Sequence, residues 1–303
     1  MKLLVTGGTN GMGKGVAKTL ASIDNQEHEI IILCRSKKLG EATIKEFEDD
    51  AKNHKVSIVL CDLTKLSDVK KAIVEIHNNH TFLDAVFINA GLGYAAKRIE
   101  TEDGMDSHFQ VNYLSQFMLT LNILDLLEKS QVGGRIIFNA TEDGEIFWDD
   151  MQMKNKWSYE DGIHQGMVAK RMFLKRLHSL YKDKKENSIS FIGFQISKIV
   201  WTNQINIIPA YMRIMATVMK FFGKFITMEE SGQIMAPLFN ESKEKTRKRS
   251  GKFITWKKNE FIEIKEVPSV LDEKLQEKLW NISLDLCEDD QTKEIFKMLL
   301  LSV

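Results

Sequence analysis

The amino-acid sequence predicts a single α/β domain built on a doubly wound, parallel sheet of about seven strands. Two observations support this fold class. A glycine-rich turn joins an apolar run at the start of the chain to a helical pattern, and further apolar runs of strand length then alternate with amphipathic helical stretches. These runs occupy residues 29–34, 56–61, 85–89, 135–139 and 189–194. Alternating strands and helices form right-handed crossovers, which place the strands side by side in parallel.

The first element contains the most informative stretch of the chain. Leu3-Leu4-Val5 is typical of a buried strand, and Thr6-Gly7-Gly8-Thr9-Asn10-Gly11-Met12-Gly13 leads from it into a helix. Gly7 allows a sharp turn off the strand, Gly11 lets the backbone approach a diphosphate, and Gly13 lets the helix pack close to the sheet. Free N–H groups at the helix N-terminus favour an anion. The stretch therefore predicts phosphate binding, and the alternative is a surface turn without chemical meaning.

Composition limits the classes of partner and compartment. The 303 residues carry 42 basic and 42 acidic side chains, so no net charge points to nucleic acid. Cys34, Cys61 and Cys287 are too few and too scattered for a disulfide framework or a zinc site. The fold begins within the first six residues, which leaves no room for a signal or transit peptide. We therefore expect a cytoplasmic protein.

The residues that close each strand matter most, because ligands of such sheets bind beyond the carboxyl ends of the strands. Cys34-Arg35-Ser36-Lys37-Lys38 closes the second strand, where the ribose of a bound adenosine would lie. NAD needs an acidic residue there to accept from both ribose hydroxyls, whereas an arginine accommodates the 2′-phosphate of NADP. Arg35 therefore favours NADP(H) as the cofactor, and the alternative is a solvated basic loop.

Further motifs follow the same order. Asp62-Leu63 closes the third strand, Asn89-Ala90-Gly91 closes the fourth, and Val111-Asn112 with Phe117 opens a long helix. Together with the Thr-Gly-x-x-x-Gly-x-Gly spacing of the first turn, they resemble the short-chain dehydrogenase/reductase family, which implies a Rossmann fold. In that family the aspartate touches adenine and the Asn-Ala-Gly turn packs beside the cofactor. The asparagine kinks its helix and holds a water molecule of a proton relay.

The resemblance continues to the end of the chain. Residues 250–254, 269–271 and 279–280 look like the tail of the retinol dehydrogenase and protochlorophyllide reductase-like branch. Because the likeness covers nearly all residues, a single domain over 1–303 is expected. The basic run at residues 241–249 is expected to be a solvated loop.

The family's catalytic set of serine, tyrosine, lysine and asparagine is only partly matched. Thr141 stands at the serine position, where its hydroxyl can donate the same hydrogen bond. Lys170 and Asn112 stand at the lysine and asparagine positions, but Gly166 occupies the position of the tyrosine. The resemblance thus implies a site without its usual proton donor.

The resemblance assigns the remaining site residues. Thr202 matches the residue that bonds the nicotinamide carboxamide, whereas Ser197-Lys198 replaces the usual Pro-Gly, and the role of Lys198 stays open. The predicted catalytic residues are Thr141, Lys170, Asn112 and His164. The predicted cofactor contacts are Thr6, Gly7, Thr9, Asn10, Gly11, Met12, Gly13, Arg35, Asp62, Leu63, Asn89, Ala90, Gly91, Lys170 and Thr202.

Three interpretations of the missing tyrosine remain open. In the first, another group supplies the proton: His164, which titrates near neutral pH and serves only if its helix starts late, Tyr159 on the preceding loop, Glu142 or Asp143. In the second, the substrate needs no strong donor, as in reduction of an activated double bond or a rearrangement without redox change. In the third, the protein binds NADP(H) without turnover and acts as a sensor or scaffold.

Residues 202–229 correspond to the variable substrate lid of the family. The segment is largely apolar, Pro209 can start a helix in it, and Arg213, Lys220 and Lys224 interrupt it. These cations make it a poor membrane span. We expect a lid over a lipophilic substrate. An amphipathic helix on a membrane surface is a less favoured alternative, and a core-facing helix or a contact between two copies is another.

The sequence as a whole predicts an NADP(H)-dependent oxidoreductase of the short-chain type, acting on a hydrophobic carbonyl or activated alkene. The alternatives are a catalytically silent dinucleotide-binding protein and a non-redox enzyme on the same fold. The physiological substrate and the oligomeric state stay open.

Overall fold

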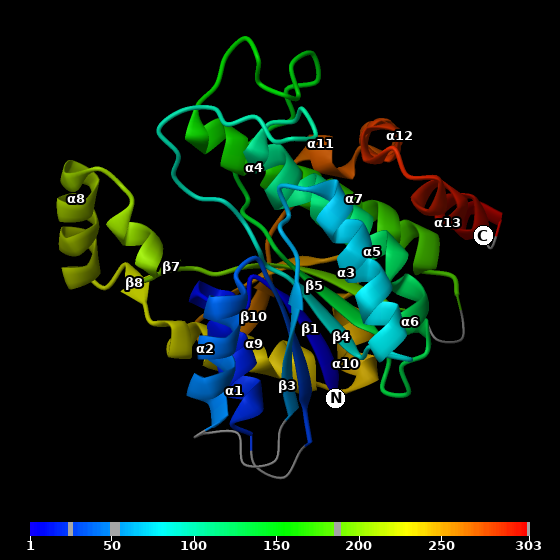
Figure 1. The fold of residues 1–303 in the computed structure, drawn as a ribbon, viewed down its shortest axis with the longest axis horizontal. Coiled ribbons are helices and arrows are strands. Elements are labelled where there is room, and N and C mark those ends of the chain that lie inside the picture. The colour runs from blue at the N-terminus through cyan, green and yellow to red at the C-terminus, as the bar shows by residue number, and fades with distance from the viewer. Residues whose placement is uncertain (24–26, 49–54, 185–188, 302–303) are drawn as a thin grey trace.

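An eight-stranded sheet forms the centre of the protein in the computed structural model, which describes residues 1–23, 27–48, 55–184 and 189–301 (Figure 1). Its strands are β1 (Lys2–Thr6), β2 (Glu29–Cys34), β3 (Lys55–Leu60), β4 (Ala85–Ile88), β5 (Arg135–Asn139), β6 (Ser190–Gln195), β9 (Phe253–Lys257) and β10 (Glu260–Glu263). They lie in the order β10-β9-β6-β5-β4-β1-β2-β3, and only the β9–β10 pair is antiparallel. The chain thus winds outward in both directions from the adjacent strands β1 and β4, which confirms the predicted doubly wound fold.

Helices cover both faces of this sheet. The described α-helices, of which α8 stands apart from the sheet, are α1 (Gly11–Ala21), α2 (Lys37–Glu48), α3 (Leu66–Asn79), α4 (Ser107–Phe109), α5 (Ser115–Asn122), α6 (Leu124–Glu128), α7 (Tyr159–Tyr181), α8 (Ala210–Phe221), α9 (Met228–Asn240), α10 (Lys243–Arg249), α11 (Pro268–Leu271), α12 (Glu273–Cys287) and α13 (Asp290–Leu301). Within β1, Leu4 packs into the core formed with α3, α5, α7 and α12, whereas Leu3 and Val5 pack into the core formed with α1 and α9. Side chains alternate between the faces of a strand, so β1 contributes to both cores.

Helices α1 and α9 cross unusually closely on one face. A Cβ at Gly15 would lie 2.0 Å from the carbonyl oxygen of Met228, and a Cβ at Gly232 would lie 2.2 Å from the carbonyl oxygen of Gly15. The two helices can pack this closely because Gly15 and Gly232 have no side chain.

The predicted strands are found within one residue of their expected bounds. The antiparallel edge strand β10 and the small pair β7 (Ile199–Val200) and β8 (Phe225–Ile226) were not expected. The loop predicted at residues 241–249 is wrong from Lys243 onward, because the Ser242 side chain caps α10 by accepting from the Lys245 N–H at 3.4 Å. Tyr159 was also expected on a loop but is the first residue of α7, which Ser158 caps.

A stretch of π-helix, η1 (Gln110–Leu114), interrupts the helical run between α4 and α5. It is fully buried, and Asn112 is its central residue. The wider turn displaces the backbone locally, as π-bulges do. Among the described helices, none combines the length and the apolar character needed to cross a bilayer.

Candidate functional site

A pocket of about 990 Å³ opens at the carboxyl ends of the parallel strands. Its walls come from the segments that follow β1, β2, β3, β4, β5 and β6, and from the segment that includes α8. This is the edge of the sheet where ligands of doubly wound folds bind. The site therefore lies where the sequence places it.

Most of the predicted cofactor contacts line this pocket. Those that do are Gly7, Thr9, Asn10, Gly11, Met12, Arg35, Asp62, Leu63, Asn89, Ala90, Gly91 and Thr202. Of the predicted catalytic residues, Thr141 lines it. Thr6, Gly13, Asn112, His164 and Lys170 belong to the described residues but not to the pocket lining.

The glycine-rich turn opens toward the pocket through its backbone. Gly7 has a φ of +69° and Gly11 a φ of +57°, a left-handed conformation that side chains disfavour. Helix α1 starts at Gly11, its N-cap residue Asn10 makes no side-chain cap, and no acidic residue stands in its first turn. No carboxylate in the first turn of α1 therefore competes for its N-terminal N–H groups, whereas the Gly7 N–H donates to the Leu33 carbonyl at 3.1 Å.

Thr6 and Gly13 support the turn from behind. The Thr6 hydroxyl accepts from the backbone N–H groups of Asn89 at 2.9 Å and Ala90 at 3.0 Å. A Cβ at Gly13 would lie 2.6 Å from the Gly7 carbonyl oxygen and from Asn89 Nδ2. These two residues join the turn after β1 to the turn after β4, so they act as positioning residues.

The groups expected at the adenosine end lie on two neighbouring strand ends. Arg35 follows β2, is exposed and lines the pocket, whereas Lys37 already belongs to α2. Asp62 follows β3, and its Oδ1 accepts from the N–H of Thr64 at 3.0 Å and from its hydroxyl at 2.8 Å. Because β2 and β3 are neighbours in the sheet, Arg35 and the Asp62 carboxylate follow adjacent strand ends.

Asn112 clamps the loop after β4. Its Oδ1 accepts from the N–H of Leu92 at 2.6 Å, and its Nδ2 donates to the Leu92 carbonyl at 3.4 Å. A Cβ at Gly166 would lie 2.7 Å from the Cβ of Asn112. Position 166, which was predicted to correspond to the tyrosine of the family, is thus closed by Asn112, since any side chain there would require a shift of this helix contact.

Lys170 is buried on the same side of α7. Its Nζ has no hydrogen-bond partner among the described residues, and burial lowers its pKa to about 7. Desolvation disfavours the charged ammonium, which is the cause of this shift. The lysine therefore lies behind the pocket wall as a group that is readily neutral.

Arg171 ties the loop after β5 to the C-terminal part of the chain. Its Nη1 donates to the carbonyls of Thr141 at 3.1 Å and Glu142 at 2.8 Å, and its Nε donates to Glu266 at 2.9 Å. Arg171 and Glu266 are both buried. This arrangement fixes the backbone of Thr141, a residue of the pocket lining whose hydroxyl is buried and has no partner among the described residues.

Sequence reasoning missed Tyr94. Among the described residues that line the pocket it is the one phenol, whereas the proposed substitutes Tyr159, Glu142, Asp143 and His164 are not part of the lining. Its ring packs edge-on against Tyr159 with 5.0 Å between centroids. The signal was its place directly after the Asn89–Gly91 turn, at the edge where ligands bind.

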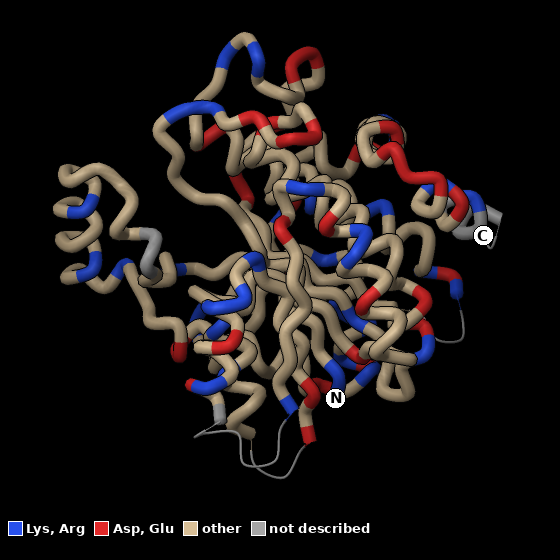
Figure 2. The backbone as a smooth tube through the Cα atoms, viewed as in Figure 1, with Lys and Arg blue, Asp and Glu red and all other residues tan. Residues whose placement is uncertain are grey.

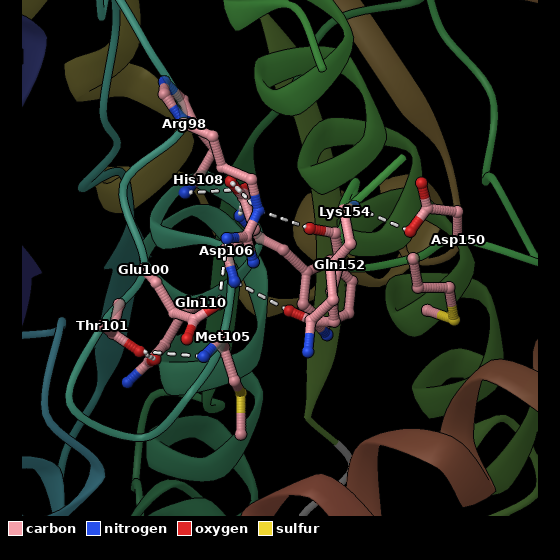
Figure 3. A network of polar contacts seen from close by, with 12 residues as sticks. Arg98, Glu100, Thr101, Met105, Asp106, His108, Gln110, Asp150, Gln152 and Lys154 are labelled. Atoms are coloured by element: carbon pink, nitrogen blue, oxygen red, sulfur yellow. Dashed lines mark hydrogen bonds and ion pairs between the residues drawn. The ribbon is translucent and has the colours of Figure 1, made fainter. Parts of the chain in front are cut away.

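A polar network holds this loop in place (Figure 3). Arg98 Nε donates to the carbonyl of Gln152 at 2.8 Å, and the Asp106 N–H donates to the Gln152 side chain at 2.8 Å. Asp106 in turn accepts from the backbone of His108 at 3.0 Å, and the ring Nε2 of His108 lies 2.8 Å from the carbonyl oxygen of Gly93. The segment around Tyr94 is therefore held from two sides, by Asn112 at Leu92 and by His108 at Gly93.

Part of the pocket lining is apolar. It includes Ile163, Met167, Ile205, Ile208, Ala216, Met219 and Phe225, with Lys198 and Lys224 among them in the sequence. Ala216 and Met219 belong to α8, so the inner face of this helix covers part of the pocket. The lining thus combines the glycine turn with apolar side chains of α8 and its neighbouring segments.

Comparison with known proteins identifies relatives of this chain. Residues 2–152 match the family described as short chain dehydrogenase. Polyprenol dehydrogenase of Danio rerio is 31% identical over 172 residues, which are 55% of this chain and 52% of that protein. Retinol dehydrogenase 12 of Homo sapiens is 23% identical over 286 residues, 94% of this chain and 85% of that protein. The matches to the polyprenol dehydrogenases of Danio rerio and Homo sapiens span about half the length of those proteins.

Solved structures share the fold. The NADPH bound carbonyl reductase from chicken fatty liver superimposes with a TM-score of 0.60 at 19% identity, over 86% of this chain and 98% of that one. The actinorhodin polyketide ketoreductase with NADPH gives 0.61 at 16% identity, over 84% and 94%. Residues 2–152, which carry the glycine-rich turn and the three strand ends that follow it, belong to the short-chain dehydrogenase family.

Proposed function

We propose that this protein is an NADP(H)-dependent oxidoreductase of the short-chain type that acts on a hydrophobic carbonyl or activated alkene. The observation that carries the proposal is the single pocket that runs from the glycine turn to the apolar side chains under α8. NADP(H) would place its anionic diphosphate at the glycine turn and its nicotinamide beside an apolar substrate under α8.

The residues present fit such a cofactor. Backbone N–H groups of the turn and of the α1 N-terminus would hold the diphosphate, and the left-handed Gly11 leaves room for its approach. Arg35 would bind the 2′-phosphate, Asp62 the adenine side and Thr202 the carboxamide. NADPH, when bound, supplies a hydride to the substrate carbon.

The chain itself would polarise the carbonyl and deliver a proton to its oxygen. Thr141 belongs to the pocket lining and its buried hydroxyl has no partner among the described residues, so we assign it the hydrogen bond to the carbonyl oxygen. We assign the proton to the phenol of Tyr94, because it is the one phenol among the described residues that line the pocket. Hydride on carbon and a proton on oxygen turn the carbonyl into a hydroxyl.

Arg35→Ala is expected to weaken NADPH binding by about tenfold to a hundredfold while NADH binding changes little, because a charge-assisted contact to the 2′-phosphate is lost. Calorimetric titration with both nucleotides measures this. Lys38→Ala, two residues past Ser36 in α2 and outside the pocket lining, is the matched control. Equal loss of NADPH and NADH affinity in Arg35→Ala would contradict the assignment of the 2′-phosphate.

Tyr94→Phe is expected to lower turnover of lipophilic aldehydes, ketones and enones by about 10²–10⁴ with NADPH affinity unchanged, the usual range for a lost general acid. Tyr159→Phe, which keeps the ring against Tyr94, is the control and should stay within a few-fold of the wild type. A Tyr94→Phe protein as active as the wild type would remove this residue from the mechanism.

A second candidate is a dinucleotide-binding protein without turnover. It is favoured by the closed position at Gly166 and by the placement of Lys170 behind the pocket wall. NADPH binding with no oxidation of NADPH across the whole substrate panel would support this candidate over the enzyme.

A further inference from the structure

Helix α8 carries an apolar face that points away from the rest of the protein. Figure 1 shows the helix set apart from the sheet and its covering helices. Ala216 is its one buried residue. Six large apolar side chains at its surface are each more than half exposed, with Phe221 at 87% and Phe222 at 70%; the other four are Tyr211, Ile214, Met215 and Val218. At about 100° per residue they share one side of the helix, over an arc of roughly 120°.

The charges around this face are of one sign. Residues 189–228 contain no Asp or Glu but contain Lys198, Arg213, Lys220 and Lys224, all exposed. Figure 2 shows blue and no red along α8. Arg213 and Lys220 leave the helix on the side away from the apolar arc, and Lys220 Nζ lies 3.9 Å from the centroid of the Trp201 ring. The segment is thus amphipathic, with a cationic side behind an exposed apolar side.

We propose that the outer face of α8 docks on the surface of an anionic lipid bilayer. With its apolar side at the acyl boundary, an in-plane helix of about 10 Å diameter places the opposite side at the level of the head groups. Anionic head groups would then supply the negative charge that the protein does not offer along residues 189–228.

A contact with a second copy of the chain accounts less well for the exposed apolar face of α8. The 12-residue helix is about 18 Å long, so its outer face alone falls far short of the roughly 800 Å² that each partner buries in a standard interface. A symmetric contact through α8 would also bring two cationic segments together without a carboxylate on either. A bilayer accepts the apolar side chains and neutralises the cations at once.

Docking in this way has a consequence for the pocket. The inner face of α8 contributes Ala216 and Met219 to its lining, so the helix separates the pocket from the bilayer by its own thickness. A lipophilic substrate dissolved in the bilayer would then lie one helix diameter, about 10 Å, from the pocket. This consequence rests on the proposed function, whereas the docking itself does not.

Vesicle co-sedimentation tests the docking without any need for turnover. The full chain is mixed with vesicles of phosphatidylcholine alone or with about one third phosphatidylglycerol. We expect binding to the anionic vesicles that weakens as salt is raised, and a loss of about tenfold or more in partitioning for Phe221→Ser/Phe222→Ser. Arg213→Gln/Lys220→Gln should lose binding to the anionic vesicles, because the head-group attraction is removed.

Matched control variants distinguish docking through α8 from nonspecific adsorption to vesicles. Val74→Ser/Val132→Ser removes two other side chains that are more than half exposed, and Lys71→Gln/Lys248→Gln removes two other exposed cations. Both should bind like the wild type. Wild-type protein that ignores all vesicles, or Phe221→Ser/Phe222→Ser protein that binds as well as the wild type, would overturn the proposal. A dimer in solution that only the phenylalanine variant dissociates would assign the face to a second copy instead.

Discussion

Replacing Gly15 by alanine is expected to lower the free energy of unfolding by about 3 kcal/mol. The new methyl group would sit 2.0 Å from the Met228 carbonyl oxygen and 2.8 Å from its carbonyl carbon, so α1 and α9 must move apart. Backbone atoms of a packed helix cannot turn aside as a side chain can. The loss is expected even though alanine favours a helix by about 1 kcal/mol over glycine.

Urea denaturation of the two proteins measures this loss. Gly40→Ala in α2 is the graded control, because its Cβ would meet the Cys34 sulfur and the Ile58 Cγ2 methyl at 2.9 Å. These are ends of side chains, which can shift, so a smaller loss is expected there. If Gly15→Ala were as stable as the wild type, the close crossing of α1 and α9 would be in error.

Lys170→Met is expected to stabilise the ligand-free protein, by roughly 2–4 kcal/mol at neutral pH. The lysine is buried without a partner among the described residues, and burial lowers its pKa from 10.5 to about 7. In the unfolded chain it stays charged up to about pH 10.5. Folding at neutral pH therefore has to remove this charge from water or neutralise it, and methionine avoids both.

The sign of the pH dependence follows from the same shift. Because the folded pKa lies below the unfolded one, the cost is full below pH 7 and disappears as the pH rises toward 10.5. Wild-type stability should gain up to about 1.4 kcal/mol per pH unit from this group within that window, and Lys170→Met should lack this contribution. The urea midpoints of the wild type and of Lys170→Met at pH 6 and pH 9.5 measure this pH dependence, and Lys71→Met is the control. Identical pH slopes would mean that Lys170 is solvated or paired.

The parts of the site that sequence could predict are those set by local chemistry. Gly7 and Gly11 have the left-handed backbone that the glycine turn implied, and the residues closing β2, β3 and β4 meet at one pocket because parallel strands end at one edge. Arg35 and Asp62 are found there for that reason. The position of Arg35 followed from strand order, whereas the role predicted for Asp62 came from the resemblance to the short-chain dehydrogenase/reductase family.

The parts that sequence could not predict depend on contacts between distant segments. Gly166 could be seen as a missing tyrosine, but its close contact with the Asn112 Cβ requires the crossing of α7 with η1. Lys170 was expected at the ribose and lies outside the lining, because rotation of a helix by a fraction of a turn decides which wall a side chain joins. The periodicity of α8 showed an amphipathic segment, but not that its larger apolar side would face outward.

The buried ion pair of Arg171 and Glu266 bears on whether residues 2–152 could fold without the C-terminal part of the chain. Residues 2–152 match the family, yet the loop that presents Thr141 is held by an arginine on α7 whose charge is balanced by a carboxylate 95 residues further along. Separating the two would leave a guanidinium without its counter-charge inside the fold, at a cost of about 3–5 kcal/mol. Residues 2–152 are therefore not an independent module, and replacing only the segment around Glu266 would disturb the backbone of Thr141 without changing any residue that lines the pocket.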